Sequence, residues 1–356
     1  MQCVSSPFLR DDRGGTCVRH QACTGVLRVP IMLSAKPNNE NHSCPVCGDA
    51  LRSQGESYDL RDIFAMWSPL AFPEQVIQEH MVIGKCTALY ACPTCKVETF
   101  LPQIIGLPSF YAAASAGEWG GGDAGGYYEV TKWDFDEALR DVKPGASLIE
   151  LGCGPGNFLK MAVARGGQVV GIEFNPHAMS VARSQGLTVY DASGIHEQEQ
   201  KSFDAAFSFH VLEHVSDPMG FLASMKEHVR PGGVIGVSVP NQDGPIRFIQ
   251  PCPMNMPPHH ASRWQLRTFE VAAQRLGLSI LRVAYEPLLL ENHSYYSIYW
   301  TRVALPGKSP LARLARTILS LSLRAFFGLL RRSGLRYFPL LRGQSIYVLM
   351  ARNDTL

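Results

Sequence analysis

The turn at residues 150–158, Glu-Leu-Gly-Cys-Gly-Pro-Gly-Asn-Phe, constrains the fold more than any other stretch of this chain. The apolar run 147–149 leads into it as a short buried strand would, and an apolar, helix-like segment follows. The first two glycines of the turn allow the backbone to bend tightly and to approach a ligand, and the third allows the helix to lie near a sheet. The next apolar run, 168–173, ends on an acid. The sequence therefore predicts a strand, a glycine turn, a helix and a second strand.

The same alternation of helix and strand continues toward the C-terminus. Connections of this kind place parallel strands in one sheet with helices on both faces. The sequence thus predicts an α/β fold with a Rossmann-like, seven-stranded, doubly wound sheet. We expect helices at 158–164, 176–185, 221–229 and 268–276, a turn at 230–233, and further strands at 187–190, 203–209, 234–239, 277–283 and 346–350.

Two C-x-x-C pairs near the N-terminus, Cys44 with Cys47 and Cys92 with Cys95, predict a small zinc-binding module. Each pair places two thiolates on one tight turn, and two such turns complete a tetrahedral metal site. The 44 residues between the pairs (91 minus 47) form a longer gap than usual, so we expect a structured insert. A closed site with four protein ligands stabilises a fold and does no chemistry. The alternative is two redox pairs or free thiols.

The acid-x-G-x-G-x-G form of the turn resembles the class I S-adenosylmethionine (SAM) methyltransferases. A glycine triplet alone is weak evidence, because NAD enzymes use a similar one. The run Val211-Leu-Glu-His-Val-Ser-Asp-Pro218 and the later Arg230-Pro-Gly-Gly233 add to it. Together they resemble the methyltransferase subgroup that includes the ubiquinone-pathway O-methyltransferases, and also methyltransferases of polysaccharide and modified-sugar pathways. The resemblance covers about residues 150–241.

The resemblance implies which residues hold the cofactor. The glycine loop would hold the methionine end of SAM, and Glu173 would accept hydrogen bonds from the two ribose hydroxyls at the sheet edge. Asp191 would bind the adenine amino group, although an aspartate there can also cap a helix. The alternative is a glycine turn without a ligand. The predicted cofactor-binding set is Glu150, Gly152, Cys153, Gly154, Gly156, Glu173, Phe174, Asp191, Ala192, Phe209 and His210.

Five residues are candidates for catalysis. His210, Glu213 and His214 follow the fourth strand, at the edge where ligands bind in such sheets. Some quinone O-methyltransferases place a metal on two acids and a histidine here, but His210 stands where the first acid would be. His259 or His260, which follows a proline-rich segment, is the first candidate for the general base. The alternatives are a structural role for His214 and a solvated loop for His259 and His260.

The C-terminal tail of the chain is rich in basic residues. Residues 302–356 contain ten basic residues and one acid, and the helix expected at 311–332 has arginines on one face and apolar residues on the other. A basic amphipathic helix suits an anionic membrane surface. The apolar face can equally pack on the core or on a second subunit. No apolar run of 18 uncharged residues is present, which predicts no transmembrane helix.

We divide the chain into four parts on these grounds. Residues 1–40 are expected to be disordered or to lie upstream of a true start at Met32. The glycine-rich stretch 117–126 is expected to be a mobile loop, and Tyr127 and Tyr128 after it either line the cofactor site or pack ordinarily. The other parts are a zinc-ribbon-like module at 41–110, a methyltransferase core with an N-terminal lid helix at 111–300, and the basic helix with the last core strand at 301–356.

The expected function is SAM-dependent methyl transfer to a small-molecule or lipid-linked sugar acceptor. A quinone-type O-methyltransferase is one alternative. An RNA methyltransferase is another, although a net charge of +2 argues against a nucleic-acid partner. A non-catalytic scaffold that binds SAM and zinc is the third. We expect a cytoplasmic protein with peripheral contact at the inner face of the membrane, and the sequence leaves its oligomeric state open.

Overall fold

The computed structural model describes residues 18–20, 31–33, 42–67, 71–116, 132–191, 193–194, 202–248, 251–290, 293, 297, 301–302, 304–307 and 309–353. Within the N-terminal 40 residues, β1 (Val18–His20) and β2 (Ile31–Leu33) pair in antiparallel fashion. The remaining residues of that stretch, the glycine-rich loop 117–126, the two tyrosines after it and Ala192 lie outside the described residues, so the predictions made for them stay predictions.

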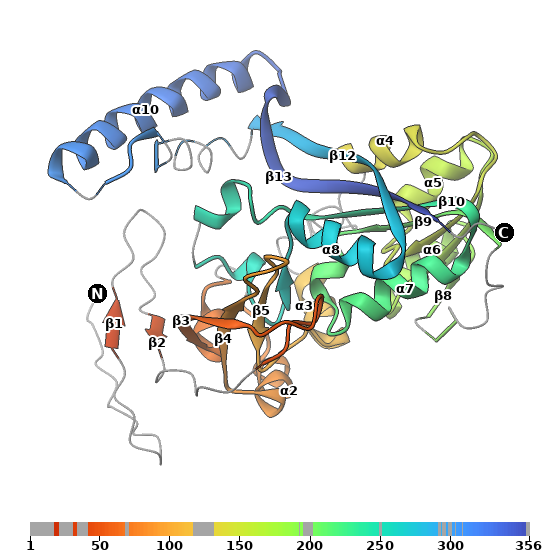
Figure 1. Cartoon of the computed structure of the whole chain (residues 1–356), viewed down its shortest axis with the longest axis horizontal. Coiled ribbons are helices and arrows are strands. Elements are labelled where there is room, and N and C mark those ends of the chain that lie inside the picture. Colours follow the sequence, from red (N-terminus) through yellow and green to blue (C-terminus); the bar gives the residue numbers. More distant parts are fainter. Residues whose placement is uncertain are drawn as a thin grey trace.

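A seven-stranded sheet forms the centre of the molecule, as predicted (Figure 1). Its order is β12-β13-β10-β9-β6-β7-β8, and β13 is antiparallel to both of its neighbours. Five strands, from β10 to β8, are parallel. The strands are β6 (Ser147–Leu151), β7 (Gln168–Ile172), β8 (Val189–Tyr190), β9 (Phe203–Phe209), β10 (Val229–Pro240), β12 (Leu278–Leu289) and β13 (Tyr337–Arg352).

Helices pack on both faces of this sheet. Phe135, Phe158 and Ala182 come from three helices and share one core cluster with the sheet. Leu222 and Phe269 come from two others and belong to the cluster on the opposite face. The first group is α4 (Trp133–Arg140), α5 (Asn157–Val163) and α6 (Pro176–Ser184), and the second is α7 (Pro218–His228) and α8 (Leu266–Leu276).

Four strands differ from their predicted bounds. The third is shorter, because only Val189 and Tyr190 pair with β7. The fifth runs through the turn predicted at 230–233, where a bulge with Gly232 at φ 75° shifts the register between Val229 and Val234. The sixth and seventh are longer, because β12 and β13 continue to pair with each other beyond β10. This extension carries α10 (Pro310–Arg332), whose start is capped by Ser309.

The cysteine module forms a second, four-stranded sheet of order β11-β5-β4-β3. The predicted insert between the cysteine pairs is structured and contains two helices. Three strands come from the module itself, but β11 (Ser262–Arg263) comes from the segment after β10 and pairs with β5. The module's elements are β3 (Arg52–Asp59), α1 (Leu60–Ala65), α2 (Glu74–Ile83), β4 (Cys86–Ala91), β5 (Glu98–Leu101) and α3 (Pro108–Ala116). The module and the core therefore share a sheet.

Candidate active site beside a four-cysteine centre

The four predicted cysteines converge. Their Sγ atoms all lie within 4.8 Å of one another, with 3.4 Å between Cys44 and Cys95 and 3.3 Å between Cys47 and Cys92. Backbone N–H groups within each turn donate to the first sulfur of the pair. A tetrahedral zinc site with Zn–S near 2.3 Å has sulfur–sulfur edges of about 3.8 Å. The donor set and its spacing fit a zinc ion after small side-chain shifts.

The glycine loop is held in conformations that side chains rarely adopt. Gly152, Gly154 and Gly156 have φ values of 79°, 52° and 81°. A Cβ on Gly152 would stand 2.3 Å from a methyl group of Val211, and one on Gly156 would stand 2.2 Å from Leu187. The turn thus needs its glycines both for backbone conformation and for space.

Glu173, the residue predicted to bind the ribose, is hydrogen-bonded to the glycine loop. Its Oε2 accepts from the Gly154 N–H at 2.8 Å, and its Oε1 accepts from the N–H groups of Phe174 and Asn175 at 2.9 and 2.7 Å. Burial raises the pKa of this carboxyl, and the three N–H donors partly offset that rise. Glu173 lines the cavity, and a carboxylate oxygen that accepts one hydrogen bond can accept another from a hydroxyl group.

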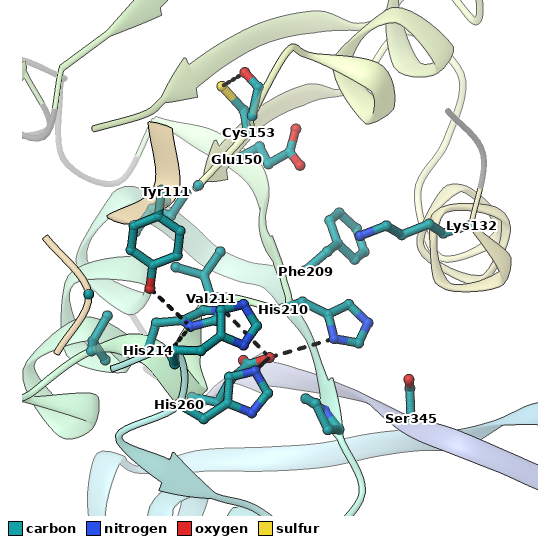
Figure 2. Close-up of a pocket in the computed structure, with 18 of the residues that line it drawn as sticks. Tyr111, Lys132, Glu150, Cys153, Phe209, His210, Val211, His214, His260 and Ser345 are labelled. Carbon is teal, nitrogen blue, oxygen red and sulfur yellow. Dashed lines mark hydrogen bonds and ion pairs between the residues drawn. The ribbon is translucent and has the colours of Figure 1, made fainter. Parts of the chain in front are cut away.

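One cavity of about 990 Å³ joins the loop to the candidate catalytic residues (Figure 2). Figure 2 shows Glu150 and Cys153 at one end and His214 and His260 at the other. The Glu150 carboxyl is buried with Oε2 lacking a hydrogen-bond partner, and burial raises its pKa well above the ordinary value. Such an orphaned acceptor in a glycine-lined pocket fits the cationic methionine end of SAM. The predicted site residues on the cavity wall are Glu150, Gly152, Cys153, Gly154, Glu173, Phe174, Phe209, His210, Glu213, His214, His259 and His260.

Two predicted cofactor residues lie elsewhere. Gly156 caps the start of α5 and packs beside Leu187, so it shapes the loop from behind. Asp191 is exposed and does not line the cavity; its Oδ1 accepts from the backbone N–H groups of Ser193 and Gly194. The Ser193 hydroxyl, followed by those two N–H donors, lowers the pKa of Asp191. This is the local capping arrangement that the sequence left open beside a role in adenine binding.

His210 links the cofactor end of the cavity to the histidine end. It is one of two non-glycine residues with positive φ in the described part of the chain, at 56°. Its Nε2 lies 3.4 Å from Asp134 Oδ2 and its Nδ1 lies 3.6 Å from Glu213 Oε1. Burial works to lower the pKa of His210, but the two carboxylates outweigh it and raise that pKa to about 9. The ring is therefore cationic at neutral pH, and its strained backbone is typical of a functional position.

His259 and His260 are buried, each with 5% of its surface exposed, and so they are not solvated loop residues. Burial lowers the pKa of both rings well below the ordinary value, and both are neutral at pH 7. The cysteine module fixes this segment. The carbonyl of Ala261 accepts from the Phe100 N–H and from the hydroxyl of Thr99, both on β5. The module thus positions the histidines from behind.

Sequence reasoning missed two residues of this site. Asp134 is completely buried in α4 against His210, and the signal for it is an acid between two aromatic residues on the apolar side of a short helix. Tyr111, on α3, places its hydroxyl 3.2 Å from His214 Nδ1. It comes from the cysteine module, 103 residues away in sequence, and no local pattern marks it.

A sequence model described as a methyltransferase domain matches residues 134–283. A ubiquinone biosynthesis O-methyltransferase of Xanthomonas campestris pv. campestris is 33% identical over 114 residues, which are 30% of this chain and 47% of that protein. One from Hahella chejuensis is 31% identical over 172 residues, which are 43% of this chain and 72% of that protein. The chain thus spans about half the length of the first of these relatives.

A solved SAM-dependent methyltransferase from Archaeoglobus fulgidus is 15% identical, with a TM-score of 0.41, over 61% of this chain and 90% of that one. Because that score is low, the assignment rests on the sequence relatives. The chain belongs to the class I SAM-dependent methyltransferase family. Within that family its relatives include distant ubiquinone O-methyltransferases, and its N-terminal part carries a four-cysteine cluster.

Proposed function

We propose that this protein transfers the methyl group of SAM to a small-molecule acceptor, or to the sugar of a lipid-linked one, bound at the histidine end of the cavity. One observation carries the proposal: the glycine loop, the Glu173 carboxylate and the histidine cluster line a single cavity. When bound, SAM supplies a methyl carbon that is already activated by the sulfonium. The protein has to hold the acceptor in line with that carbon and exclude water.

Different residues of the cavity bind the cofactor and assist the acceptor. Glu150 offers an unpaired carboxylate oxygen to the cationic end of the cofactor, and Glu173 offers its remaining acceptor site to the ribose. A hydroxyl acceptor loses its proton as it attacks, so a group that takes up the proton or lowers the hydroxyl pKa speeds the transfer. The neutral rings of His259 and His260 and the carboxylate of Glu213 are placed for that role. His210, being cationic, suits an anionic acceptor group better than it suits proton abstraction.

Measurements of SAM binding and of methyl transfer test this function separately. Calorimetry should show binding of SAM that Gly154→Arg abolishes, and cell extracts incubated with methyl-labelled SAM should yield a labelled product only with the unchanged chain. Loss of binding with a retained fold supports the loop assignment. Binding without any labelled product in aqueous or lipid extracts would contradict methyl transfer and favour a scaffold role. A labelled quinol precursor would select the O-methyltransferase alternative that the relatives' names suggest.

We also propose that the four cysteines hold a structural zinc ion. The short sulfur–sulfur distances and the N–H donors to sulfur support it. Elemental analysis should find zinc that is lost when Cys44 and Cys92 are changed to serine. A folded wild-type chain with no metal would contradict the proposal.

We further propose that the basic helix α10 contacts an anionic membrane surface. Its buried contact is Phe327, which packs on Leu288 and Leu290 of the β12 end. On the other side, a stripe of apolar side chains points away from the protein, and Leu314, Ile318 and Leu321 are each about 60% exposed. Figure 1 shows α10 lying apart from the central sheet. In the described part of the chain, no helix is both long and apolar enough to span a membrane.

Flotation with anionic vesicles tests this contact. The unchanged chain should float, and Leu314→Asp with Ile318→Asp should remain in solution, because charges on the stripe oppose insertion. Val82→Asp with Val163→Asp, at exposed apolar positions off α10, should float like the unchanged chain. Failure of the unchanged chain to float would contradict the membrane contact. Self-association that only the α10 variant loses would identify a second copy as the occupant of the stripe.

A further inference from the structure

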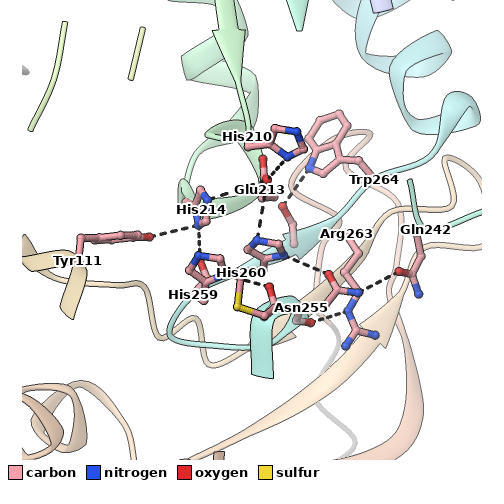
Figure 3. A network of polar contacts seen from close by, with 12 residues as sticks. Tyr111, His210, Glu213, His214, Gln242, Asn255, His259, His260, Arg263 and Trp264 are labelled. Carbon is pink, nitrogen blue, oxygen red and sulfur yellow. Dashed lines mark hydrogen bonds and ion pairs between the residues drawn. The ribbon is translucent and has the colours of Figure 1, made fainter. Parts of the chain in front are cut away.

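A second group of metal-binding side chains lies in the cavity, apart from the cysteines. One ring nitrogen from each of His214, His259 and His260 lies within 4.8 Å of those of the other two. The carboxylate of Glu213 lies beside two of these rings, with Oε1 3.8 Å from His260 Nε2 and 3.9 Å from His214 Nε2 (Figure 3). Two of these residues follow β9 and two follow the proline-rich segment, so the fold brings together ligands 45 residues apart.

The hydrogen bonds of the three rings place the lone pair of each on Nε2. The Nδ1 atoms of His214 and His259 face the carbonyl oxygens of His259 and Met254, and a carbonyl oxygen can only accept. Each Nδ1 must therefore carry the hydrogen. Metal-binding histidines show this arrangement, because a second partner on the other nitrogen fixes the tautomer and the ring.

A longer chain of hydrogen bonds fixes His260, and Figure 3 shows its part from Gln242 through Asn255 to His260. The carboxylate of Glu98 accepts from Gln242 Nε2 at 3.1 Å, so the Gln242 oxygen is left to accept from Asn255 Nδ2 at 3.2 Å. The Asn255 oxygen then accepts from His260 Nδ1 at 3.1 Å. Since a carboxylate cannot donate, every group in the chain has one orientation. It ends with the lone pair of His260 on Nε2, and it starts on β5 of the cysteine module.

The buried carboxylate of Glu213 favours a cation beside it. Its side chain is 1% exposed, and neither of its oxygens has a hydrogen-bond partner. A buried carboxylate without partners is costly unless a positive charge lies close to it. His210 is near, but its Nε2 is directed to Asp134, and its Nδ1 is 3.6 Å from Glu213. The carboxylate therefore lies next to the Nε2 atoms of His260 and His214, two members of the three-histidine group.

We propose that His214, His259, His260 and Glu213 bind a divalent first-row transition-metal ion at the acceptor end of the cavity. Metal–ligand distances near 2.1 Å give a tetrahedral edge of about 3.4 Å. The two Glu213–histidine distances of 3.8 and 3.9 Å exceed that edge by a few tenths of an ångström, and the ring nitrogens, which lie within 4.8 Å of one another, have to move closer by up to about 1.4 Å. Imidazole ligands favour zinc, iron, nickel or copper over magnesium. An ion here would lower the pKa of a hydroxyl that reaches it from the cavity. The site differs from the two-acid arrangement expected by resemblance, because two ligands come from the 259–260 segment.

Metal content measured on the full chain tests this site without relying on methyl transfer. After dialysis against Zn²⁺ or Co²⁺, the unchanged chain should hold one ion more than Glu213→Gln or His260→Gln. His177→Ala, which removes an exposed histidine on α6, should hold as much as the unchanged chain. With Co²⁺, the ion that these variants lose should show d–d absorption without thiolate charge transfer, which separates it from an ion at the cysteines.

Thermal unfolding provides a second test that remains informative if a variant alters the fold. Zn²⁺ added after treatment with a chelator should raise the melting temperature of the unchanged chain more than that of Glu213→Gln. If no ion binds at this group, added Zn²⁺ should shift the melting temperatures of the unchanged chain and of Glu213→Gln by the same amount. That result, or equal metal content in the unchanged chain and Glu213→Gln, would overturn the proposal. Calorimetry with SAM on Glu213→Gln should still show binding, so failure here leaves the proposed function standing.

Discussion

Replacing Gly152 with alanine separates what the glycine loop does for binding from what it does for the fold. The residue has φ 79°, a conformation that costs a non-glycine residue about 1–2 kcal/mol. The new Cβ would also stand 2.3 Å from Val211, and relieving such an overlap costs about 1–3 kcal/mol. Together they predict that the free energy of unfolding falls by about 2–5 kcal/mol. Because Gly152 lines the cavity, SAM binding should also be lost.

Gly186→Ala is the matched control. Gly186 has φ 80°, but a Cβ there would meet nothing within 4 Å, and the residue does not line the cavity. The free energy of unfolding of Gly186→Ala should fall only by the conformational cost, about 1–2 kcal/mol, and this variant should bind SAM normally. Adding Val211→Ala to Gly152→Ala should restore the portion of the unfolding free energy that is lost through the overlap with Val211. Denaturant unfolding and calorimetry measure both effects. Equal losses in the two alanine variants, or normal SAM binding by Gly152→Ala, would refute this reasoning.

Three further predictions follow from the same contacts. SAM affinity should fall as the pH is lowered through the raised pKa of Glu173, beginning above the ordinary value of 4.5, because a protonated carboxyl loses acceptor capacity; Glu173→Gln should bind weakly with no such dependence. Cys92→Ser should increase hydrogen exchange at 259–263 as well as in the module, because β11 pairs with β5, and unchanged exchange there would separate the module from the site. Asp134→Asn should lower the pKa of His210 from about 9, measured by NMR, because the ring loses one of its two anionic neighbours.

The central sheet could be predicted from the sequence because its signals are local. Each strand is a short apolar run, and the helices between them begin and end at residues such as Pro176 and Gly277. The glycine turn and the acid after the second strand could be found for the same reason. Their contact, from the Gly154 N–H to Glu173, joins residues only 19 apart.

The histidine end of the cavity could not be predicted in the same way, because it depends on pairing between distant segments. The partner of Thr99 is Ala261, 162 residues further along the chain, and no local pattern indicates that contact. Prolines around His259 suggest an exposed loop, whereas β5 and the aromatic residues of the module bury it. The burial of Asp134 is likewise decided by a partner, His210, that lies on another element.

A crystal structure with S-adenosylhomocysteine bound measures the central claim most directly. We predict the ligand at the carboxyl ends of β6 and β7, with its ribose hydroxyls on Glu173 and its amino acid end on the glycine loop beside Glu150. An empty cavity at saturating ligand, with Glu173 still bonded only to the backbone N–H groups of Gly154, Phe174 and Asn175, would contradict it.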